Sequence, residues 1–139
     1  MNKNFLIVNA NYYKDISSGL LKSATNLLPK NSKVKIINVP GVFEIPVTIS
    51  RNIKKFDGFI ALGCVIKGQT PHFDFISQAS TEAIMKLSIS SKKPIGNGII
   101  TCLNMKQAKA RKKKGAEAAN AVLSVLSQKW KAHLVPKII

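Results

Sequence analysis

Four short strand-like segments, separated by segments with helical periodicity, restrict the fold of this chain more than any other feature of its sequence. They cover residues 5–8, 34–39, 59–66 and 94–101. The first and third are continuous apolar runs, which are typical of strands buried on both faces, and alternation of strand and helix favours a parallel sheet covered by helices. The sequence therefore predicts one α/β domain over residues 1–139, a three-layer α/β/α sandwich with a central, mainly four-stranded parallel sheet.

Helices are predicted between and after these segments from the spacing of apolar residues. They cover about residues 17–28, 46–54 and 116–131, and a further helix follows the loop at residues 67–72. That further helix should bury the face that carries Ile76, Ala79, Ala83 and Leu87. The last helix should bury a side formed by Ala119, Val122, Leu123, Leu126 and Trp130.

Composition excludes several classes of protein. The 139 residues include 22 Lys plus Arg and 6 Asp plus Glu, a formal charge of +16, yet 45% are hydrophobic, so a core can form. Of the 22 cations, 20 are lysines spread along the chain, which favours a solvated surface over a nucleic-acid site. No run is long enough to span a membrane. Cys64 and Cys102 show no metal-ligand spacing, so we expect neither a disulfide framework nor a metal site. The same cysteine usage leads us to expect a cytoplasmic location.

The loops at residues 9–14, 40–46, 67–73 and 101–105 follow the predicted strands, and parallel sheets bind ligands at the carboxyl ends of their strands. The third loop nearly matches the phosphate-binding pattern GxxxxGK[ST], but Gln69 replaces the lysine, which disfavours a triphosphate. Thr70 as a helix N-cap and Pro71 at the first helical position predict an anion site suited to a phosphate monoester. The alternative is that these two residues only begin a helix.

Several side chains at these strand ends are candidates for catalysis or ligand binding. His72 can serve as an acid–base catalyst, although a lone histidine is often structural. Glu44 lies between apolar residues and needs hydrogen-bond donors, which a hydroxyl-rich ligand or a helix start can supply. Tyr12 and Tyr13 can stack on a planar heterocycle or simply pack. Arg111 suits a bidentate phosphate contact, and the three lysines after it fit a solvated helix end.

Taken together, four segments resemble the 6,7-dimethyl-8-ribityllumazine synthase family over nearly the whole chain. They are GVFEIP at 41–46, ALGCVIKGQTPHFD at 61–74, PIGNG at 94–98 and KGAEAA at 114–119. The resemblance implies a flavodoxin-like fold without a metal or organic cofactor. It also implies that 5-amino-6-(D-ribitylamino)uracil and 3,4-dihydroxy-2-butanone 4-phosphate condense to 6,7-dimethyl-8-ribityllumazine, phosphate and water, the penultimate step of riboflavin biosynthesis.

The resemblance also implies roles for individual residues. His72 would be the proton donor and acceptor, and Gln69, Thr70 and Arg111 would hold the phosphate. Tyr12 would stack on the pyrimidine, and Glu44 would accept hydroxyl protons of the ribityl chain. The remaining contacts would come from Val42 and Phe43 at the ribityl site, from Cys64, Val65 and Ile66 at the uracil, and from Asn97 and Lys114.

Three segments depart from the family pattern. Asn97 stands where the family commonly has phenylalanine, so one wall of the pocket is expected to be more polar. The segment CLN at 102–104 lacks the usual threonine and acidic residue, and the stretch from Arg111 to Gly115 is shorter than in familiar members. The family implies a homopentamer with sites between subunits, and the sequence leaves open a 60-subunit shell and association with riboflavin synthase.

Two other functions stay open at this point. One is a basic α/β binding protein for RNA or a phosphorylated metabolite, although the spread of lysines makes a nucleic-acid partner the weaker choice. The other is a family member that keeps the fold without the activity, which the change at Asn97 would allow.

Overall fold

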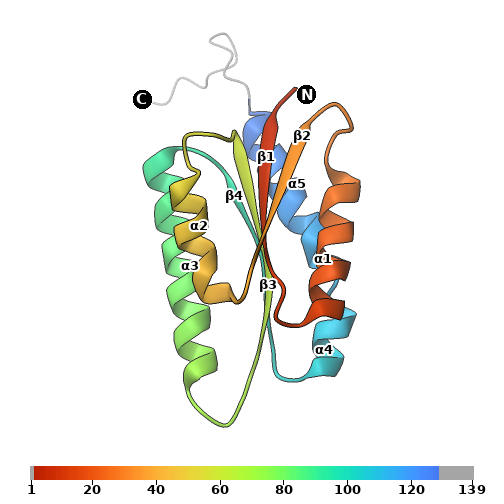
Figure 1. The fold of residues 1–139 in the computed structure, drawn as a ribbon, viewed down its shortest axis with the longest axis vertical. Helices are drawn as coiled ribbons and strands as arrows, with labels where there is room; N and C mark the ends of the chain where they lie inside the picture. Colours follow the sequence, from red (N-terminus) through yellow and green to blue (C-terminus); the bar gives the residue numbers. More distant parts are fainter. Residues whose placement is uncertain (1, 129–139) are drawn as a thin grey trace, which may run out of the picture.

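The computed structural model describes residues 2–128 and contains one parallel four-stranded sheet in the order β2-β1-β3-β4. The strands are β1 (Asn4–Ala10), β2 (Lys33–Val39), β3 (Gly58–Ile66) and β4 (Ile95–Cys102). Ile7 of β1 pairs with Ile36 of β2 and Ile60 of β3, so all carboxyl ends point the same way (Figure 1). The predicted sheet is confirmed.

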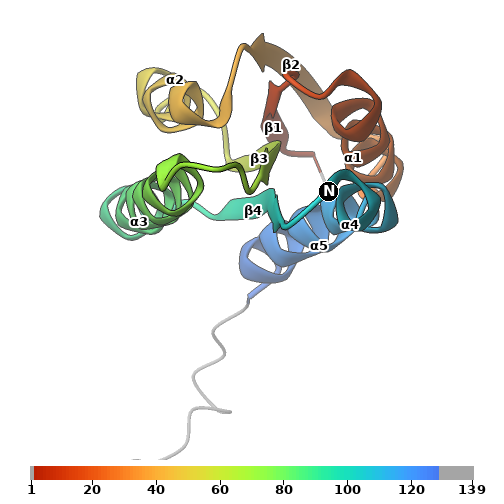
Figure 2. The ribbon, with the colours of Figure 1, turned by 90° about the horizontal axis from the view of Figure 1, so that it is seen from below.

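Helices cover both faces of the sheet (Figure 2). One layer holds α1 (Lys14–Leu27), α4 (Met105–Ala110) and α5 (Lys114–Leu126). The other holds a short 3-10 turn (Val42–Glu44), α2 (Ile45–Arg51) and α3 (His72–Ser91). The three-layer α/β/α sandwich is therefore also confirmed.

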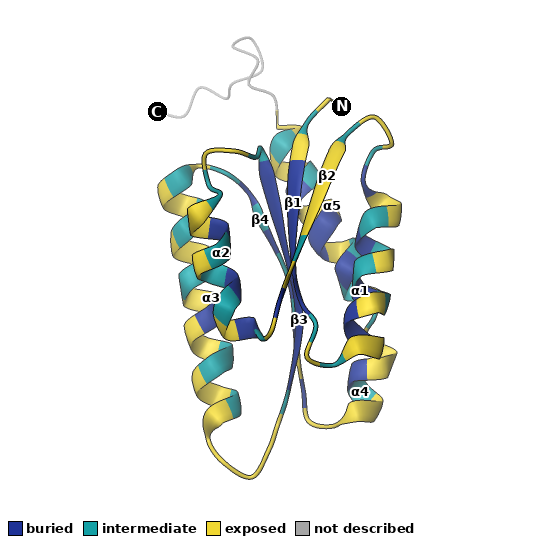
Figure 3. Ribbon diagram, viewed as in Figure 1, coloured by how far each residue is buried: buried dark blue, intermediate teal, exposed yellow. Residues whose placement is uncertain are grey.

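β3 is the most buried strand, since eight of its nine residues are buried (Figure 3). Its alternate side chains enter two separate cores. Ile60 and Leu62 pack with α1 and α5, whereas Phe59 and Ala61 pack with α2 and α3. Full burial of each large apolar side chain stabilises the fold by roughly 1.5–3 kcal/mol, so the central strand fixes both helical layers.

α5 packs closely against β4 and α1. A Cβ atom on Gly96 would lie 2.2 Å from the carbonyl oxygen of Ala118, and one on Gly115 would lie 2.1 Å from that of Leu20. Both are backbone atoms that cannot move aside, so glycine is required at the two positions. The close packing fixes the start of α5, and therefore the chain around Arg111 that precedes it.

Helix boundaries differ from the predicted ones in several places. α5 covers Lys114–Leu126 instead of about 116–131. α1 begins at Lys14 instead of about residue 17, because its N-cap, Tyr13, makes no side-chain capping bond that would mark the start. α2 covers Ile45–Arg51 instead of 46–54. It ends early because tight turns follow and bring Asp57 to Asn4, whose N–H donates to the carboxylate at 2.8 Å.

The predicted buried face of α3 is confirmed in part, because Ile76 and Leu87 pack against the core and Ala79 and Ala83 do not. The residues that α3 buries are Ser80 and Ile84, whereas Ala79 is exposed and Ala83 is half-buried. The small side chains of Ala79 and Ala83 instead line a groove beside α2. In α5, Ala119 and Val122 are buried as predicted, Leu123 and Leu126 are half-buried, and Trp130 lies outside the described residues.

No helix within residues 2–128 has the length and apolar character needed to cross a membrane.

Candidate active site

The loops after β1, β2 and β3 surround a cavity of about 660 Å³ at the carboxyl end of the sheet. Most of its wall comes from strand ends and the loops beyond them, as expected for a parallel sheet. The residues in the wall are Tyr12, Tyr13, Gly41, Val42, Phe43, Glu44, Cys64, Val65, Ile66, His72 and Ile76. Eight of the thirteen residues predicted from the sequence meet in this one space.

His72 is the first residue of α3 and lies on the wall of the cavity. Its backbone N–H donates to the Thr70 hydroxyl at 3.4 Å. The helix therefore starts one residue later than predicted, with Pro71 as N-cap, and the Thr70 hydroxyl still reaches its first turn. Gln69 and Thr70 are exposed in the preceding loop. The N-terminus of a 20-residue helix and an imidazole thus face the same solvent-open end of the sheet.

Glu44 ends the short 3-10 turn after β2. Its N–H donates to the Gly41 carbonyl at 3.2 Å, and its Oε1 lies 3.3 Å from where a Cβ atom on Gly41 would be. Glycine therefore leaves room for the carboxylate to bend over the loop. Val42 is buried beneath the turn and Phe43 is 70% exposed above it. The turn holds a half-buried carboxylate at the cavity with an apolar ring beside it.

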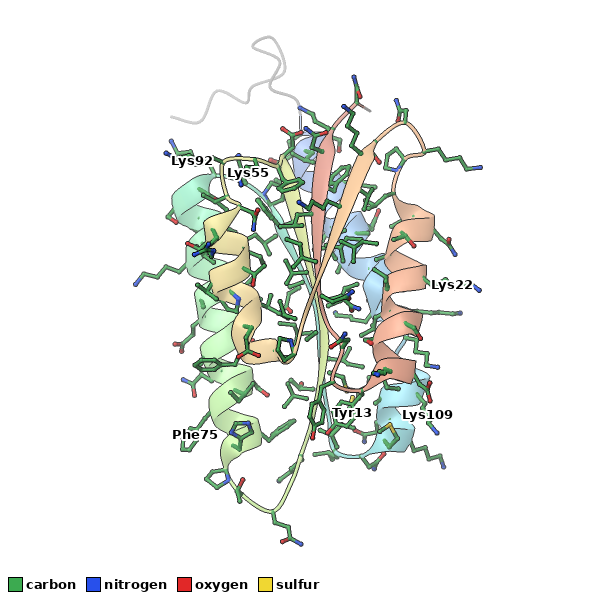
Figure 4. The ribbon with its side chains drawn as sticks, viewed as in Figure 1. Tyr13, Lys22, Lys55, Phe75, Lys92 and Lys109 are labelled. Atoms are coloured by element: carbon green, nitrogen blue, oxygen red, sulfur yellow. The ribbon has the colours of Figure 1, made fainter. Side chains whose placement is uncertain are left out.

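Two tyrosines form the opposite wall. Their rings meet edge to face at 4.9 Å, with Tyr12 74% exposed and Tyr13 packed against the core at the end of the sheet (Figure 4). Burial raises the pKa of Tyr13, and the charges of Cys64 and Tyr12 raise it further. The ring of Tyr12 is therefore open to a ligand on the side away from Tyr13.

A second cavity, of about 710 Å³, lies along the β4 edge between α3 and α5. Arg111 donates from Nη1 to the Thr101 carbonyl at 3.1 Å, which holds its guanidinium at the end of β4. Asn97 accepts the Ile99 N–H at 3.1 Å through its side chain. The wall consists of Thr81, Asn97, Ile99, Ile100, Thr101, Ala110, Arg111, Lys113, Lys114 and Glu117.

The structure therefore divides eleven of the thirteen predicted site residues between two cavities, and Gln69 and Thr70 line neither of them. Asn97, Arg111 and Lys114 line the cavity at the β4 edge, and none of them lines the cavity that contains His72. Sequence reasoning placed Tyr13 near the ligand but did not select it, and it missed Ile76. Helical spacing could have identified Ile76, because a residue four positions after His72 lies on the same side of α3.

Cys64 contributes to the wall of the first cavity, and Cys102 lies buried at the end of β4. Burial raises the pKa of the Cys64 thiol to about 12, with a further contribution from Cys102. Within residues 2–128 no group of three or more His, Cys, Asp or Glu side chains could hold a metal ion. The side chains that line the first cavity offer hydrogen bonding, stacking and proton transfer.

Comparisons with known proteins agree on one family. The model of the 6,7-dimethyl-8-ribityllumazine synthase family matches residues 2–129. The 6,7-dimethyl-8-ribityllumazine synthase of Bartonella bacilliformis is 42% identical over 139 residues, covering 93% of this chain and 91% of the relative. That of Agrobacterium fabrum is 42% identical, covering 91% and 94%, and that of Bartonella henselae is 44% identical, covering 89% and 86%.

Proposed function

The chain belongs to the 6,7-dimethyl-8-ribityllumazine synthase family, and we propose how its residues carry out the family's reaction. The enzyme is a transferase of riboflavin biosynthesis that condenses 5-amino-6-(D-ribitylamino)uracil with 3,4-dihydroxy-2-butanone 4-phosphate. The products are 6,7-dimethyl-8-ribityllumazine, phosphate and water. Since two substrates must meet, holding both in reactive orientation can supply much of the rate. The comparisons give no support to a basic binding protein.

The first cavity is the proposed site of the pyrimidine substrate. Its polar and apolar walls match the two parts of that molecule. The exposed ring of Tyr12 can stack on the uracil, and the half-buried Glu44 can accept hydrogen bonds from the ribityl hydroxyls. Backbone groups of the remaining wall residues would complete the contacts, from Val42 and Phe43 to the ribityl chain and from Cys64, Val65 and Ile66 to the uracil.

The loop before α3 is the proposed phosphate site. Gln69 and Thr70 are exposed next to the N-terminus of a 20-residue helix, where free N–H groups and the helix dipole favour an anion. One guanidinium in addition would hold a phosphate monoester through two parallel hydrogen bonds. Arg111 is the proposed donor of that guanidinium, and Lys114 adds positive charge on the same cavity wall.

His72 is the proposed acid–base residue. It lies between the phosphate loop and the pyrimidine cavity, so one imidazole can reach both reacting centres. Formation of the imine requires proton transfer at the amine and carbonyl oxygen, and loss of phosphate requires removal of a proton from the adjacent carbon. Histidine can donate and accept protons near neutral pH, which suits it to both steps.

The division of the site between two cavities supports a second copy of the chain as part of each active site. His72 and Arg111 line different cavities of one chain, so a neighbouring chain that docks its β4 edge against the first cavity would complete the set. The exposed apolar side chains of Phe43 and Val47 beside the first cavity suit such a contact. We propose a homopentamer, the ring that the family resemblance implies, with five interfacial sites.

Absorbance of the lumazine product tests the assignment of His72. Purified protein is mixed with both substrates and the uncatalysed condensation is subtracted. We expect His72→Ala to lower kcat by about 10²-fold if His72 transfers protons, with the circular dichroism spectrum unchanged. Gln78→Ala, on an exposed part of the same helix, is the matched control. Equal kcat in the wild type and His72→Ala would rule out the role.

Mixed oligomers test the shared site. His72→Ala and Arg111→Ala are each expected to be nearly inactive. In a mixed ring, a site is complete when the chain that supplies His72 carries Arg111→Ala and its neighbour, which supplies Arg111, carries His72→Ala. Random assembly gives that arrangement at about one quarter of the interfaces. Co-expressed variants should therefore recover about one quarter of the wild-type rate. A mixture that stays as inactive as its parts, although mass spectrometry shows mixed rings, would assign both residues to sites within single chains.

The two free cysteines support a cytoplasmic location, because a reducing compartment keeps thiols unpaired.

A further inference from the structure

Lys112 differs from its neighbours in the run of four cations between α4 and α5. Arg111, Lys113 and Lys114 all line the cavity at the β4 edge, and Lys112 does not. Its side chain is half-buried and lies against α1 instead. The proposed function uses Arg111 and Lys114 for the phosphate and gives Lys112 no role, although Lys112 lies between them in the chain.

α1 holds both the side chain and the backbone of Lys112. A Cβ atom on Gly19 would lie 2.5 Å from Cδ and 2.9 Å from Cγ of Lys112, so the aliphatic part of the lysine lies directly on the helix backbone. The Ser23 hydroxyl donates to the Lys112 carbonyl at 2.9 Å. Gly19 and Ser23 are four residues apart and therefore share one face of α1, here called the docking face.

The glycine on the docking face has a cost that the contact explains. Gly19 lies in the interior of α1, which covers Lys14–Leu27. Glycine inside a helix is less favourable than alanine, so a side chain at this position would favour the helix if there were room for it. Lys112 occupies that room. Long cationic side chains often pack through their apolar carbons and not through their charge.

The backbone around Lys112 transmits this contact to the phosphate residues. The Lys114 N–H donates to the Arg111 carbonyl at 3.0 Å, and the Arg111 N–H donates to the Ala108 carbonyl at 3.1 Å. The turn is therefore one hydrogen-bonded unit, and α1 lies beside it (Figure 2). Arg111 is held at its guanidinium by the Thr101 carbonyl and at its backbone through Lys112.

We propose that Lys112 is a positioning residue for Arg111 and Lys114, and that it acts through its aliphatic chain and its carbonyl on the docking face of α1. The inference rests on the proposed phosphate site. A guanidinium holds a phosphate through two parallel hydrogen bonds only in the correct orientation, and a misplacement of about 1 Å can cost about 10²-fold in rate. The ammonium charge of Lys112 takes no part in this role.

Steady-state kinetics with each substrate varied in turn test the proposal. Lys112→Ala removes the aliphatic chain, so the KM for the butanone phosphate should rise by about 10-fold while the KM for the pyrimidine substrate changes by less than about twofold. Lys112→Met removes the charge and keeps an unbranched apolar chain, and it should behave as the wild type does. Lys109→Ala removes an exposed lysine of α4 and is the matched control, with both KM values unchanged.

Gly19→Ala tests the same contact from the other side. Alanine favours a helix more than glycine does, so a purely structural role for Gly19 predicts that the variant loses no activity. A methyl group there would instead push the aliphatic chain of Lys112 off the docking face. We expect the KM for the butanone phosphate to rise as in Lys112→Ala, with the melting temperature no lower than that of Lys112→Ala.

Arg111→Ala separates failure of this proposal from failure of the proposed phosphate site. If Arg111→Ala leaves kcat/KM for the butanone phosphate unchanged, the phosphate site is wrong and the positioning role loses its basis. If Arg111→Ala lowers that value, whereas Lys112→Ala and Gly19→Ala have the circular dichroism spectrum and both KM values of the wild type, the positioning role alone is overturned. Equal losses in Lys112→Met and Lys112→Ala would also overturn it, because the charge would then be what matters.

Discussion

Burial, more than the intrinsic reactivity of a thiol, determines the protonation state of Cys64. The thiol lies on the cavity wall with 9% of its surface exposed, and burial is the main reason why its pKa rises to about 12. A thiol is a nucleophile only in its ionised form. At neutral pH Cys64 therefore stays protonated, and the substrate contact proposed for it depends on its shape and backbone groups.

The raised pKa of Cys64 predicts a loss of stability at alkaline pH. The thiol ionises near 9.0 in the unfolded chain and near 12 in the folded one, so the unfolded state loses its proton first. The stabilisation is complete below pH 9 and declines as the pH rises from 9 towards 12, by at most about 1.4 kcal/mol per pH unit.

Urea unfolding at pH 8, 9 and 10 measures this loss. The free energy of unfolding should fall more steeply in the wild type than in Cys64→Ala, which lacks only this thiol. Parallel pH profiles of the two proteins would contradict the assignment.

A second consequence at the scale of single residues concerns Gly41. A methyl group there would lie 3.3 Å from Glu44 Oε1, so Gly41→Ala should displace the carboxylate by a few tenths of an ångström. We expect a higher KM for the pyrimidine substrate and an unchanged KM for the butanone phosphate, both from steady-state kinetics. Gly68→Ala is the control, because a Cβ atom there meets no atom within 4 Å.

At the scale of elements, apolar runs were a better guide than helical faces. β1 and β3 follow from continuous apolar runs, because a strand buried on both faces leaves no alternation to misinterpret. Only part of the buried face of α3 was predictable in the same way. Ala79 and Ala83 repeat as core residues do, yet they line the groove beside α2, and Ser80 takes the buried position. A small apolar side chain fits either environment.

The candidate site was also predictable only in part. The carboxyl ends of parallel strands gather at one edge of a sheet, which brought Tyr12, Glu44 and His72 together in the prediction. The same rule does not say toward which neighbour each loop turns. The chain after β4 passes into α4 on the α1 side, and it carries Arg111 to a different cavity from His72.

Ser23 of α1 acts as a cap for α5 from another helix. Its hydroxyl donates to the Lys112 carbonyl at 2.9 Å and accepts the Ala116 N–H at 3.1 Å. No side chain caps α5 from its own N-terminus, so Ser23 gives the first turn a side-chain acceptor: the Ala116 N–H donates to it as well as to the Lys113 carbonyl at 3.0 Å.

Ser23→Ala should therefore destabilise the protein by about 1–2 kcal/mol, measured by urea unfolding. Ser124→Ala makes the same chemical change within α5, where the hydroxyl only donates to the Asn120 carbonyl in its own helix, and should cost less than about 0.5 kcal/mol. Equal losses in the two variants would show that Ser23 does not cap α5.

At the scale of the whole molecule, the exposed apolar surface beside the first cavity is where the proposed ring would make its contacts. Val47 of α2 is 57% exposed next to the groove that α2 forms with α3. Val47→Lys places a charge in the proposed contact and should give folded monomers by analytical ultracentrifugation, with the condensation rate near background. Leu27→Lys changes an apolar residue of α1 that is 41% exposed and should leave the ring intact. Monomers that keep full activity would contradict a shared site.

The buried run of β3 also affects the chain before it folds. Gly58–Ile66 contains no charged residue, and such a segment, when exposed in a newly made chain, pairs readily with copies of itself and starts aggregation. The net charge of +16 opposes that step, because two unfolded chains repel each other over a distance that shrinks as salt is added. The lysines far from the cavity, such as Lys55 and Lys92 (Figure 4), would therefore act outside catalysis, through electrostatic repulsion between unfolded chains. The yield of refolding should accordingly fall as ionic strength rises, even where the folded enzyme is unaffected.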